Sequence, residues 1–295
     1  MRSMLKFVTV FIVFLAVVIP SVAQPPLSAL DESCDIKLQQ GLANCLTLLR
    51  LGKAADRKSL SIALIDITDP SAPRQAYINP NEMMYAASLP KIAILLGAFE
   101  RIENGQMDLD ATTRDKLTKM IRNSSNQAAT EMLNRIGKDY LAGLLQSPRY
   151  RLYDPDRNGG LWVGKEYSKS GAWKRDPLHN LSHGATAFQV ARFYYMLEQG
   201  QLVSPESSRQ MKSMLAAPAI NHKFVKGLKS KHPDSRIYRK SGTWGPYHAD
   251  SAIVEHHGRR YIAVVLAKSP QGGRWLSELI VAMDSLIFET GPSLN

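Results

Sequence analysis

A serine and a lysine three residues apart, Ser88 and Lys91, stand at the start of an apolar stretch that runs to Leu96. Residues i and i+3 share one face of a helix, so the spacing predicts that Ser88 Oγ and Lys91 Nζ lie within hydrogen-bond reach. The apolar residues predict a buried helix, and burial lowers the pKa of a lysine. A neutral amine accepts a proton from a hydroxyl, and the free N–H groups of the first helical turn stabilise an oxyanion. Ser88 and Lys91 are therefore our candidate nucleophile and base.

Two further polar motifs lie downstream. Ser124-x-Asn126 sits in a connector between two expected helices, and Lys240-Ser241-Gly242-Thr243 ends a β-rich run. Each motif is weak alone, since Lys-Ser-Gly recurs at 169–171 and Ser-x-Asn at 293–295. Only the copies at 124 and 240 have a regular element beside them, so the secondary-structure context favours them.

In this order and setting, the three motifs resemble the S-x-x-K, S-D-N and K-T-G signatures of the serine β-lactamases and penicillin-binding proteins. The run after Lys91, together with Ala128-Ala129 and Gly137, looks most like the class A β-lactamases. The resemblance covers nearly all of the chain after residue 23. It implies an acyl-enzyme mechanism without a cofactor and a small β-lactam or D-alanyl peptide as substrate. The implied roles are Ser88 as nucleophile, Lys91 as base, Ser124 as proton shuttle, Asn126 for the substrate amide, and Lys240, Ser241, Gly242 and Thr243 for the substrate carboxylate and the oxyanion.

The resemblance is incomplete at the residue that would activate water for deacylation. Class A enzymes resemble one another in a Glu-x-x-Leu-Asn sequence, whereas Glu166 is followed by Tyr-Ser-Lys-Ser. Glu166 is our candidate for this role, and a carboxylate with a surface role is the alternative, because a general base must first satisfy geometry. Asp176 is a weaker substitute and is better explained as a turn residue before Pro177. Only 36 residues separate Ser88 from Ser124, which predicts an open pocket.

The elements around these motifs predict one α/β domain of the α+β type. Two β-rich segments, 59–68 and 74–78, precede Ser88, and three more follow at 236–244, 250–255 and 260–268. Adjacent strands tend to pair, so we expect a five-stranded antiparallel sheet flanked by helices, with an all-helical insertion, as in β-lactamases and transpeptidases. The expected partition has its α/β part at about 31–87 and 216–295 and its helical part at about 88–215. We expect residues 149–183 to be a long irregular loop.

The first 23 residues have the form of a cleavable signal peptide. Arg2 and Lys6 precede an apolar run that is too short to span a bilayer comfortably, and Ser21-Val22-Ala23 fits a cleavage site. The sequence thus predicts a catalytic domain of residues 24–295 that is periplasmic or secreted, monomeric, and without a stable membrane anchor.

The composition excludes some classes of partner. The formal charge is +11, and +9 without Arg2 and Lys6, but no dense basic run with interleaved aromatics indicates nucleic-acid binding. The seven histidines contain no H-x-x-x-H pattern, and neighbours such as His256 and His257 would point to opposite faces of a strand, so we expect no metal site.

A disulfide between Cys34 and Cys45 is permitted in an oxidising compartment if Gly41 breaks the intervening helix; otherwise the two are too far apart.

Three functions are compatible with these features. The leading hypothesis is a secreted serine β-lactamase of the class A type. The alternatives are a penicillin-binding or D-alanyl peptidase-like enzyme that deacylates slowly, and a non-catalytic protein that binds cell-wall fragments.

Overall fold

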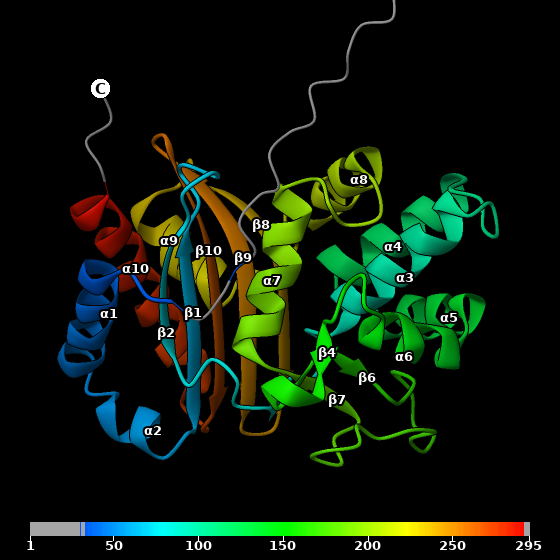
Figure 1. Ribbon diagram of the computed structural model, residues 1–295, viewed down its shortest axis with the longest axis horizontal. Helices are drawn as coiled ribbons and strands as arrows, with labels where there is room; N and C mark the ends of the chain where they lie inside the picture. Colours follow the sequence, from blue (N-terminus) through cyan, green and yellow to red (C-terminus); the bar gives the residue numbers. More distant parts are fainter. Residues whose placement is uncertain (1–29, 31–32, 292–295) are drawn as a thin grey trace, which may run out of the picture.

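The computed structural model describes residue 30 and residues 33–291. Its centre is a five-stranded antiparallel sheet of β1 (Leu60–Asp66), β2 (Arg74–Ile78), β8 (Arg236–Trp244), β9 (Tyr247–His256) and β10 (Arg259–Lys268) (Figure 1). The strand order is β2-β1-β10-β9-β8, so β1 from the first half of the chain pairs with the final strand. The predicted sheet, built from both ends of the chain, is confirmed.

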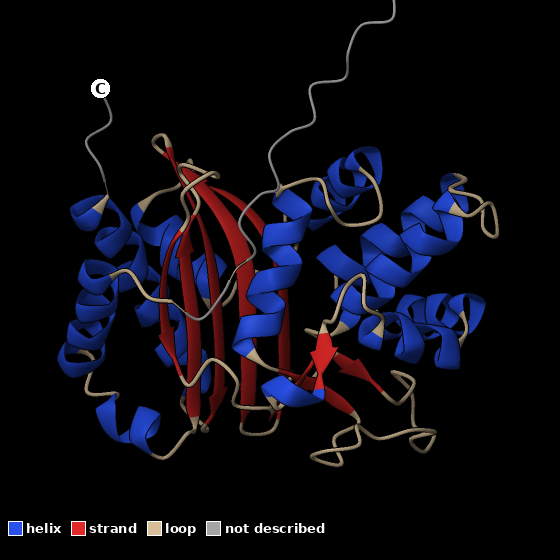
Figure 2. Ribbon diagram, viewed as in Figure 1, coloured by secondary structure: helices blue, strands red, loops and turns tan. Residues whose placement is uncertain are grey.

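Both faces of the sheet are covered by helices. α1 (Ile36–Leu48), α9 (Phe224–Lys231) and α10 (Gly272–Thr290) pack on one face, and α7 (Ala187–Glu198) packs on the other (Figure 2). Successive residues of a strand point to opposite faces, and the core follows this alternation. Ile65 of β1 belongs to the cluster on the α7 side, whereas its neighbour Leu64 belongs to the cluster beneath α1 and α10.

Helix α1 is continuous through Gly41, so it is not broken there. A Cβ at Gly41 would lie 2.1 Å from Leu286 Cδ1, which explains the glycine by the close approach of α1 to α10. Cys34 and Cys45 stand at opposite ends of this rigid segment and are not joined in a disulfide.

The remaining helices form a second body beside the β8 edge of the sheet (Figure 1). These are α3 (Lys91–Glu103), α4 (Ala111–Arg122), α5 (Asn126–Ile136), α6 (Lys138–Gln146) and α8 (Pro205–Leu215). Helix α3 is buried along most of its length, as its apolar sequence predicts. The N-cap of α5 is Ser125, whose Oγ accepts a hydrogen bond from Ala128 N. This cap fixes the connector that carries Ser124.

The segment 149–183 is more ordered than the sequence predicts. It contains η1 (Pro155–Arg157) and the strands β4 (Tyr153–Asp154), β5 (Gly159–Gly160) and β6 (Trp162–Val163), and is followed by β7 (His183–Ala185). Strand β7 pairs with both β6 and β3 (Met84–Tyr85). Strands of two or three residues are too short to show the alternation of apolar and polar residues from which a strand is predicted. The pairing of β7 with β3 holds this segment against the residues just before Ser88.

A short helix, α2 (Gly52–Asp56), completes the fold. In the part of the chain that the structure describes, no helix has both the length and the hydrophobicity needed to cross a membrane. The predicted signal peptide, residues 1–23, lies outside the described residues.

Candidate active site

Ser88 lies in the turn between β3 and α3. Leu89 N donates to Ala86 O at 3.0 Å, and Ala87 has a φ of 51°, in the left-handed region that residues with a Cβ rarely adopt. A strained residue next to a candidate nucleophile is typical of a site where the surrounding structure fixes the backbone.

Lys91 is the first residue of α3, and its side chain is fully buried. Its Nζ donates to Ser124 O at 2.6 Å, to Asn126 Oδ1 at 2.8 Å and to Ser124 Oγ at 3.3 Å. Among the described residues no hydrogen bond joins Lys91 Nζ to Ser88 Oγ, in contrast to the expectation from helical spacing. The reason is that Ser88 precedes the helix and the amine is directed toward the connector.

Ser124 Oγ lies between two buried amines. Besides its contact with Lys91, it accepts from Lys240 Nζ at 3.0 Å, and Lys240 also donates to Ser241 O at 2.8 Å. Burial lowers the pKa of Lys91 to about 7. Burial, together with the nearby Lys91, holds the pKa of Lys240 well below its ordinary value. Within the described ranges neither lysine forms an ion pair with a carboxylate.

Strand β8 brings the third motif against the Ser88 turn. A Cβ on Gly242 would lie 2.1 Å from Ala86 O and 2.8 Å from Ser88 N, so only glycine permits this approach. Because β8 is an edge strand, alternate backbone groups on its outer side are not used by the sheet and face this turn. Thr243 is exposed, whereas Ser241 is buried beneath it.

A further lysine, which the sequence analysis did not single out, supports β8 from behind. Lys223 Nζ donates to Gly242 O at 2.6 Å, to Thr243 Oγ1 at 2.7 Å and to Ala249 O at 3.1 Å. Burial lowers the pKa of Lys223 to about 8, against the opposing attraction of Asp250. This side chain orients the hydroxyl of Thr243.

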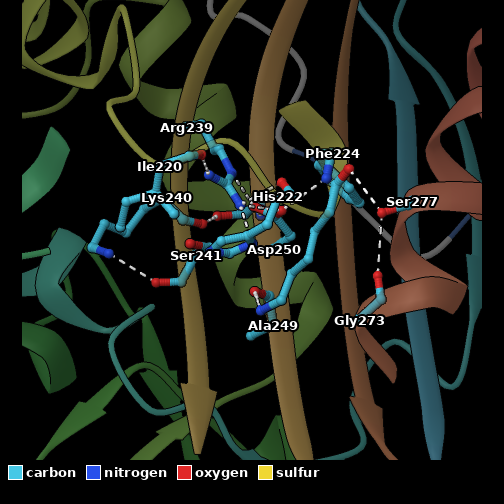
Figure 3. A network of polar contacts seen from close by, with 12 residues as sticks. Ile220, His222, Phe224, Arg239, Lys240, Ser241, Ala249, Asp250, Gly273 and Ser277 are labelled. Atoms are coloured by element: carbon cyan, nitrogen blue, oxygen red, sulfur yellow. Dashed lines mark hydrogen bonds and ion pairs between the residues drawn. The ribbon is translucent and has the colours of Figure 1, made fainter. Parts of the chain in front are cut away.

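The segment that carries Lys223 is anchored by a buried ion pair. Arg239 donates to both oxygens of Asp250, each at 2.7 Å, and also to the carbonyls of Ile220 and His222 (Figure 3). Asp250 accepts in addition from Phe224 N at 3.1 Å, where α9 begins. The sequence gives no signal for this network, because its members are far apart in the chain.

Tyr167 covers Lys91 on the side of the 149–183 segment. Lys91 Nζ lies 4.5 Å from the centre of the Tyr167 ring, and Tyr167 OH donates to Ala87 O at 3.3 Å. The ring packs against His183, with centres 4.3 Å apart. Tyr167 therefore fills the space beside Lys91 and the Ser88 turn.

The side chain of Glu166 is directed toward α6. Its Oε1 accepts from Lys138 Nζ at 2.5 Å, and its Oε2 accepts from Ser168 and Ser170, each at 3.4 Å. The hydrogen bond from Lys138 holds the pKa of Glu166 below its ordinary value. Asp176 is buried and accepts from Tyr153 OH and from loop N–H groups, as expected of a turn residue.

Ser88, Asn126, Glu166 and Thr243 line one cavity of about 680 Å³. Lys91 and Lys240, which are not among its lining residues, both contact Ser124 Oγ. The three motifs therefore converge, although they are far apart in the sequence. Aromatic side chains complete the wall: Tyr85, Tyr167, His183, Trp244 and Tyr247.

The sequence matches the model of the beta-lactamase enzyme family over residues 46–116 and 110–290, and the chain belongs to this family. No curated protein matches the sequence.

Solved structures share the fold at low sequence identity. PBP-A is 17% identical with a TM-score of 0.65, and the match covers 89% of this chain and 99% of that one. A β-lactamase from Sphaerobacter thermophilus is 15% identical with a TM-score of 0.65, covering 85% and 97%. A point mutant of PBP-A, solved as an acyl-enzyme complex with penicillin G, is 18% identical with a TM-score of 0.64, covering 88% and 98%.

Proposed function

We propose that the protein is a serine β-lactamase-like hydrolase in which Ser88 attacks the β-lactam carbonyl and becomes acylated. The observation that carries the proposal is the position of Ser124 Oγ between Lys91 Nζ and Lys240 Nζ, behind the cavity that Ser88 lines. Opening an amide needs a nucleophile, a proton route to nitrogen and donors for the oxyanion. The residues around Ser88 include each of these groups.

In the proposed acylation step, Lys91 Nζ has to turn from Ser124 and Asn126 toward Ser88 Oγ. Lys91, which is neutral in a large fraction of molecules at pH 7, takes the proton of Ser88 as the serine oxygen bonds to the carbonyl carbon. The backbone N–H groups of Ser88 and Thr243 stabilise the oxyanion. Ser124 then passes a proton to the lactam nitrogen as the C–N bond breaks.

Substrate binding is proposed for the groups that line the cavity or lie behind it. Asn126 is exposed in the cavity and holds the substrate amide, while Lys240, Ser241, Gly242 and Thr243 form the wall that receives the substrate carboxylate. With a net charge of +9 without Arg2 and Lys6 and with two buried lysines here, an anionic substrate is favoured over a cationic one. The leader supports a periplasmic or secreted location, and we expect a monomer.

Hydrolysis of the acyl-enzyme requires an activated water, and Glu166 is the proposed base because its residue lines the cavity with Ser88. To act, its carboxylate must release Lys138. A slow-deacylating penicillin-binding or D-alanyl peptidase-like enzyme is the second candidate. Two observations favour it: both oxygens of Glu166 are engaged elsewhere, and Tyr167 fills the space beside Lys91.

A time course with a fluorescent penicillin separates these functions. Wild-type protein should be labelled; labelling that fades indicates a β-lactamase, and labelling that persists indicates a penicillin-binding enzyme. Ser88→Ala should abolish labelling, whereas Ser168→Ala, an exposed serine of the same cavity, should not. If the wild type is not labelled, the protein is a non-catalytic binder of cell-wall fragments. If Ser88→Ala is labelled as strongly as the wild type, Ser88 is not the nucleophile.

The same assay tests Glu166. If its carboxylate activates the deacylating water, Glu166→Gln should convert fading label into persistent label while the labelling rate stays unchanged. If the rate of fading is the same in both proteins, Glu166 has no part in deacylation.

A further inference from the structure

A cluster of histidine and aspartate side chains lies at the end of β9 opposite to the active site. His232 caps the C-terminus of α9, His256 ends β9, and Asp284 belongs to α10. His232 Nε2 lies 3.3 Å from Asp284 Oδ2, and His256 Nδ1 lies 3.8 Å from the same oxygen. One ligand atom from each of the three residues falls within 4.8 Å of the others.

One buried member of this cluster, His256, lacks the hydrogen bonds that buried polar groups normally form. His256 is only 5% exposed, yet among the described residues neither of its ring nitrogens has a hydrogen-bond partner. Buried polar groups without a partner are rare and costly, and a bound cation would give these nitrogens a partner. The rings of His232 and His256 also pack with centres 4.1 Å apart, which brings their nitrogens to one place.

Asp284 is held as a metal-binding carboxylate would be. It is 1% exposed, and its Oδ1 accepts from Tyr261 OH at 2.7 Å. Ligating carboxylates are commonly fixed by a second hydrogen bond of this kind. The bond from Tyr261 leaves Oδ2 directed at the two histidines.

We propose that His232 Nε2, His256 Nδ1 and Asp284 Oδ2 form a binding site for a divalent transition-metal ion, with Zn²⁺ the best match. Two ligand atoms about 2.1 Å from a tetrahedral zinc are about 3.4 Å apart, close to the separations of 3.3 and 3.8 Å observed here. Two imidazoles and a carboxylate leave a fourth position for water. We expected no metal site because the histidines contain no H-x-x-x-H pattern; His232, His256 and Asp284 are separated by 24 and 28 residues, so no short motif contains them.

The surroundings indicate which class of cation fits. A cavity of about 550 Å³ reaches His256 from outside, and Arg236, Arg259 and Arg260 line it. Asp234 and Glu255 line it as well, so the charges at this entrance are mixed, and selectivity has to come from coordination by imidazole nitrogen. Imidazole ligands favour zinc and its neighbours, whereas Mg²⁺ and Ca²⁺ prefer oxygen. Bound metal would join α9, β9 and α10, so it would stabilise the fold rather than take part in catalysis.

A second, outer group shares His256. His257 Nε2 lies 3.1 Å from Asp234 Oδ2, but both side chains are more than half exposed. The prediction that His256 and His257 point to opposite faces is wrong: His257 has a φ of 41° in the β9–β10 turn, and the two rings stack with centres 4.1 Å apart. This outer pair provides a matched control, because it offers the same chemistry without the buried carboxylate.

The test uses tag-free protein treated with a chelator and then titrated with Co²⁺ and Zn²⁺. We expect one Co²⁺ per chain with the visible absorption of tetrahedral cobalt, its displacement by Zn²⁺, and a rise in the melting temperature with Zn²⁺ but not with Mg²⁺. His232→Gln should weaken binding by more than about tenfold. The side chain of His232 is 36% exposed, so this variant should fold.

Two further variants test which side chains are ligands. Asp284→Asn retains an acceptor for Tyr261 OH and should also lose the metal, whereas His257→Gln should bind as the wild type does. The proposal is overturned if the wild type binds no metal, if His232→Gln binds normally, or if His257→Gln loses the metal.

Discussion

At the scale of single residues, the site depends on two buried lysines, Lys91 and Lys240, that form no ion pair with a carboxylate among the described residues. Lys91 and Lys240 both contact Ser124 Oγ, and burial shifts the pKa of each downward. Removing a charged ammonium from water favours its neutral form, which is the form that accepts a proton. The basic character of Lys91 is thus produced by its position at the start of an apolar helix.

The pKa of Lys91 predicts the pH dependence of acylation. Since the folded-state pKa is lowered to about 7, the amine is charged and inactive as a base below that pH and neutral above it. The acylation rate should rise about tenfold per pH unit below pH 7 and level off above it. Stopped-flow measurement with a chromogenic β-lactam at several pH values checks this profile.

Lys91→Arg tests the same point independently. A guanidinium stays protonated in this range, so acylation should slow by about 10² to 10⁴. Lys165→Arg, in a residue that lines the cavity, is the control and should retain the wild-type rate. A variant with arginine at 91 that reacts normally would show that Lys91 is not the base.

At the scale of elements, the contact between β8 and the Ser88 turn decides whether the site is complete. Edge strands carry unpaired backbone groups, and here one such edge faces the turn before α3 instead of solvent. The distance from a Cβ at position 242 to Ala86 O would be 2.1 Å, and both sides of this contact are backbone.

Gly242→Ala should therefore separate β8 from the Ser88 turn. We expect acylation to fall at least tenfold, because a shift of even 1 Å in a reacting geometry has a cost of this order or more. Gly171→Ala, where a new Cβ meets nothing within 4 Å, is the matched control. Normal acylation by a folded Gly242→Ala protein would contradict the role given to this contact.

Lys223→Met tests the support behind β8. The change removes three hydrogen bonds of a buried amine, to Thr243 Oγ1 and to the carbonyls of Gly242 and Ala249, so we expect a loss of about 1–3 kcal/mol in the free energy of unfolding. The second-order acylation rate should fall as well, since Thr243 loses its orientation. Lys226→Met, at an exposed lysine three residues on, should change neither quantity. Denaturant titration and the chromogenic assay measure the two effects, and an unchanged acylation rate would limit Lys223 to a structural role.

At the scale of the whole molecule, the sequence predicted the sheet, the buried α3 helix and the convergence of three motifs. The strands are rich in β-branched residues and the helices are amphipathic or apolar, so local pattern and tertiary structure agree. The convergence around Ser124 was predictable only through the order of the motifs and the family they resemble, because local pattern does not specify which distant elements meet.

Other features had no signal of this kind. Lys223 and Tyr167 belong to no motif in the sequence, and their contacts with β8 and Lys91 depend on the packing of α9 and of the 149–183 segment. Glu166 lies in that segment, but its pairing with Lys138 required the position of α6. The cluster of His232, His256 and Asp284 joins three elements that are unrelated in sequence.

The central claim is that Ser88 becomes covalently acylated. Intact-protein mass spectrometry after brief exposure to penicillin G, followed by peptide mapping, tests it most directly. We expect a single adduct on the peptide that contains Ser88, absent from Ser88→Ala and unaltered in Ser168→Ala. An adduct on any other residue, or an adduct that survives in Ser88→Ala, would contradict it.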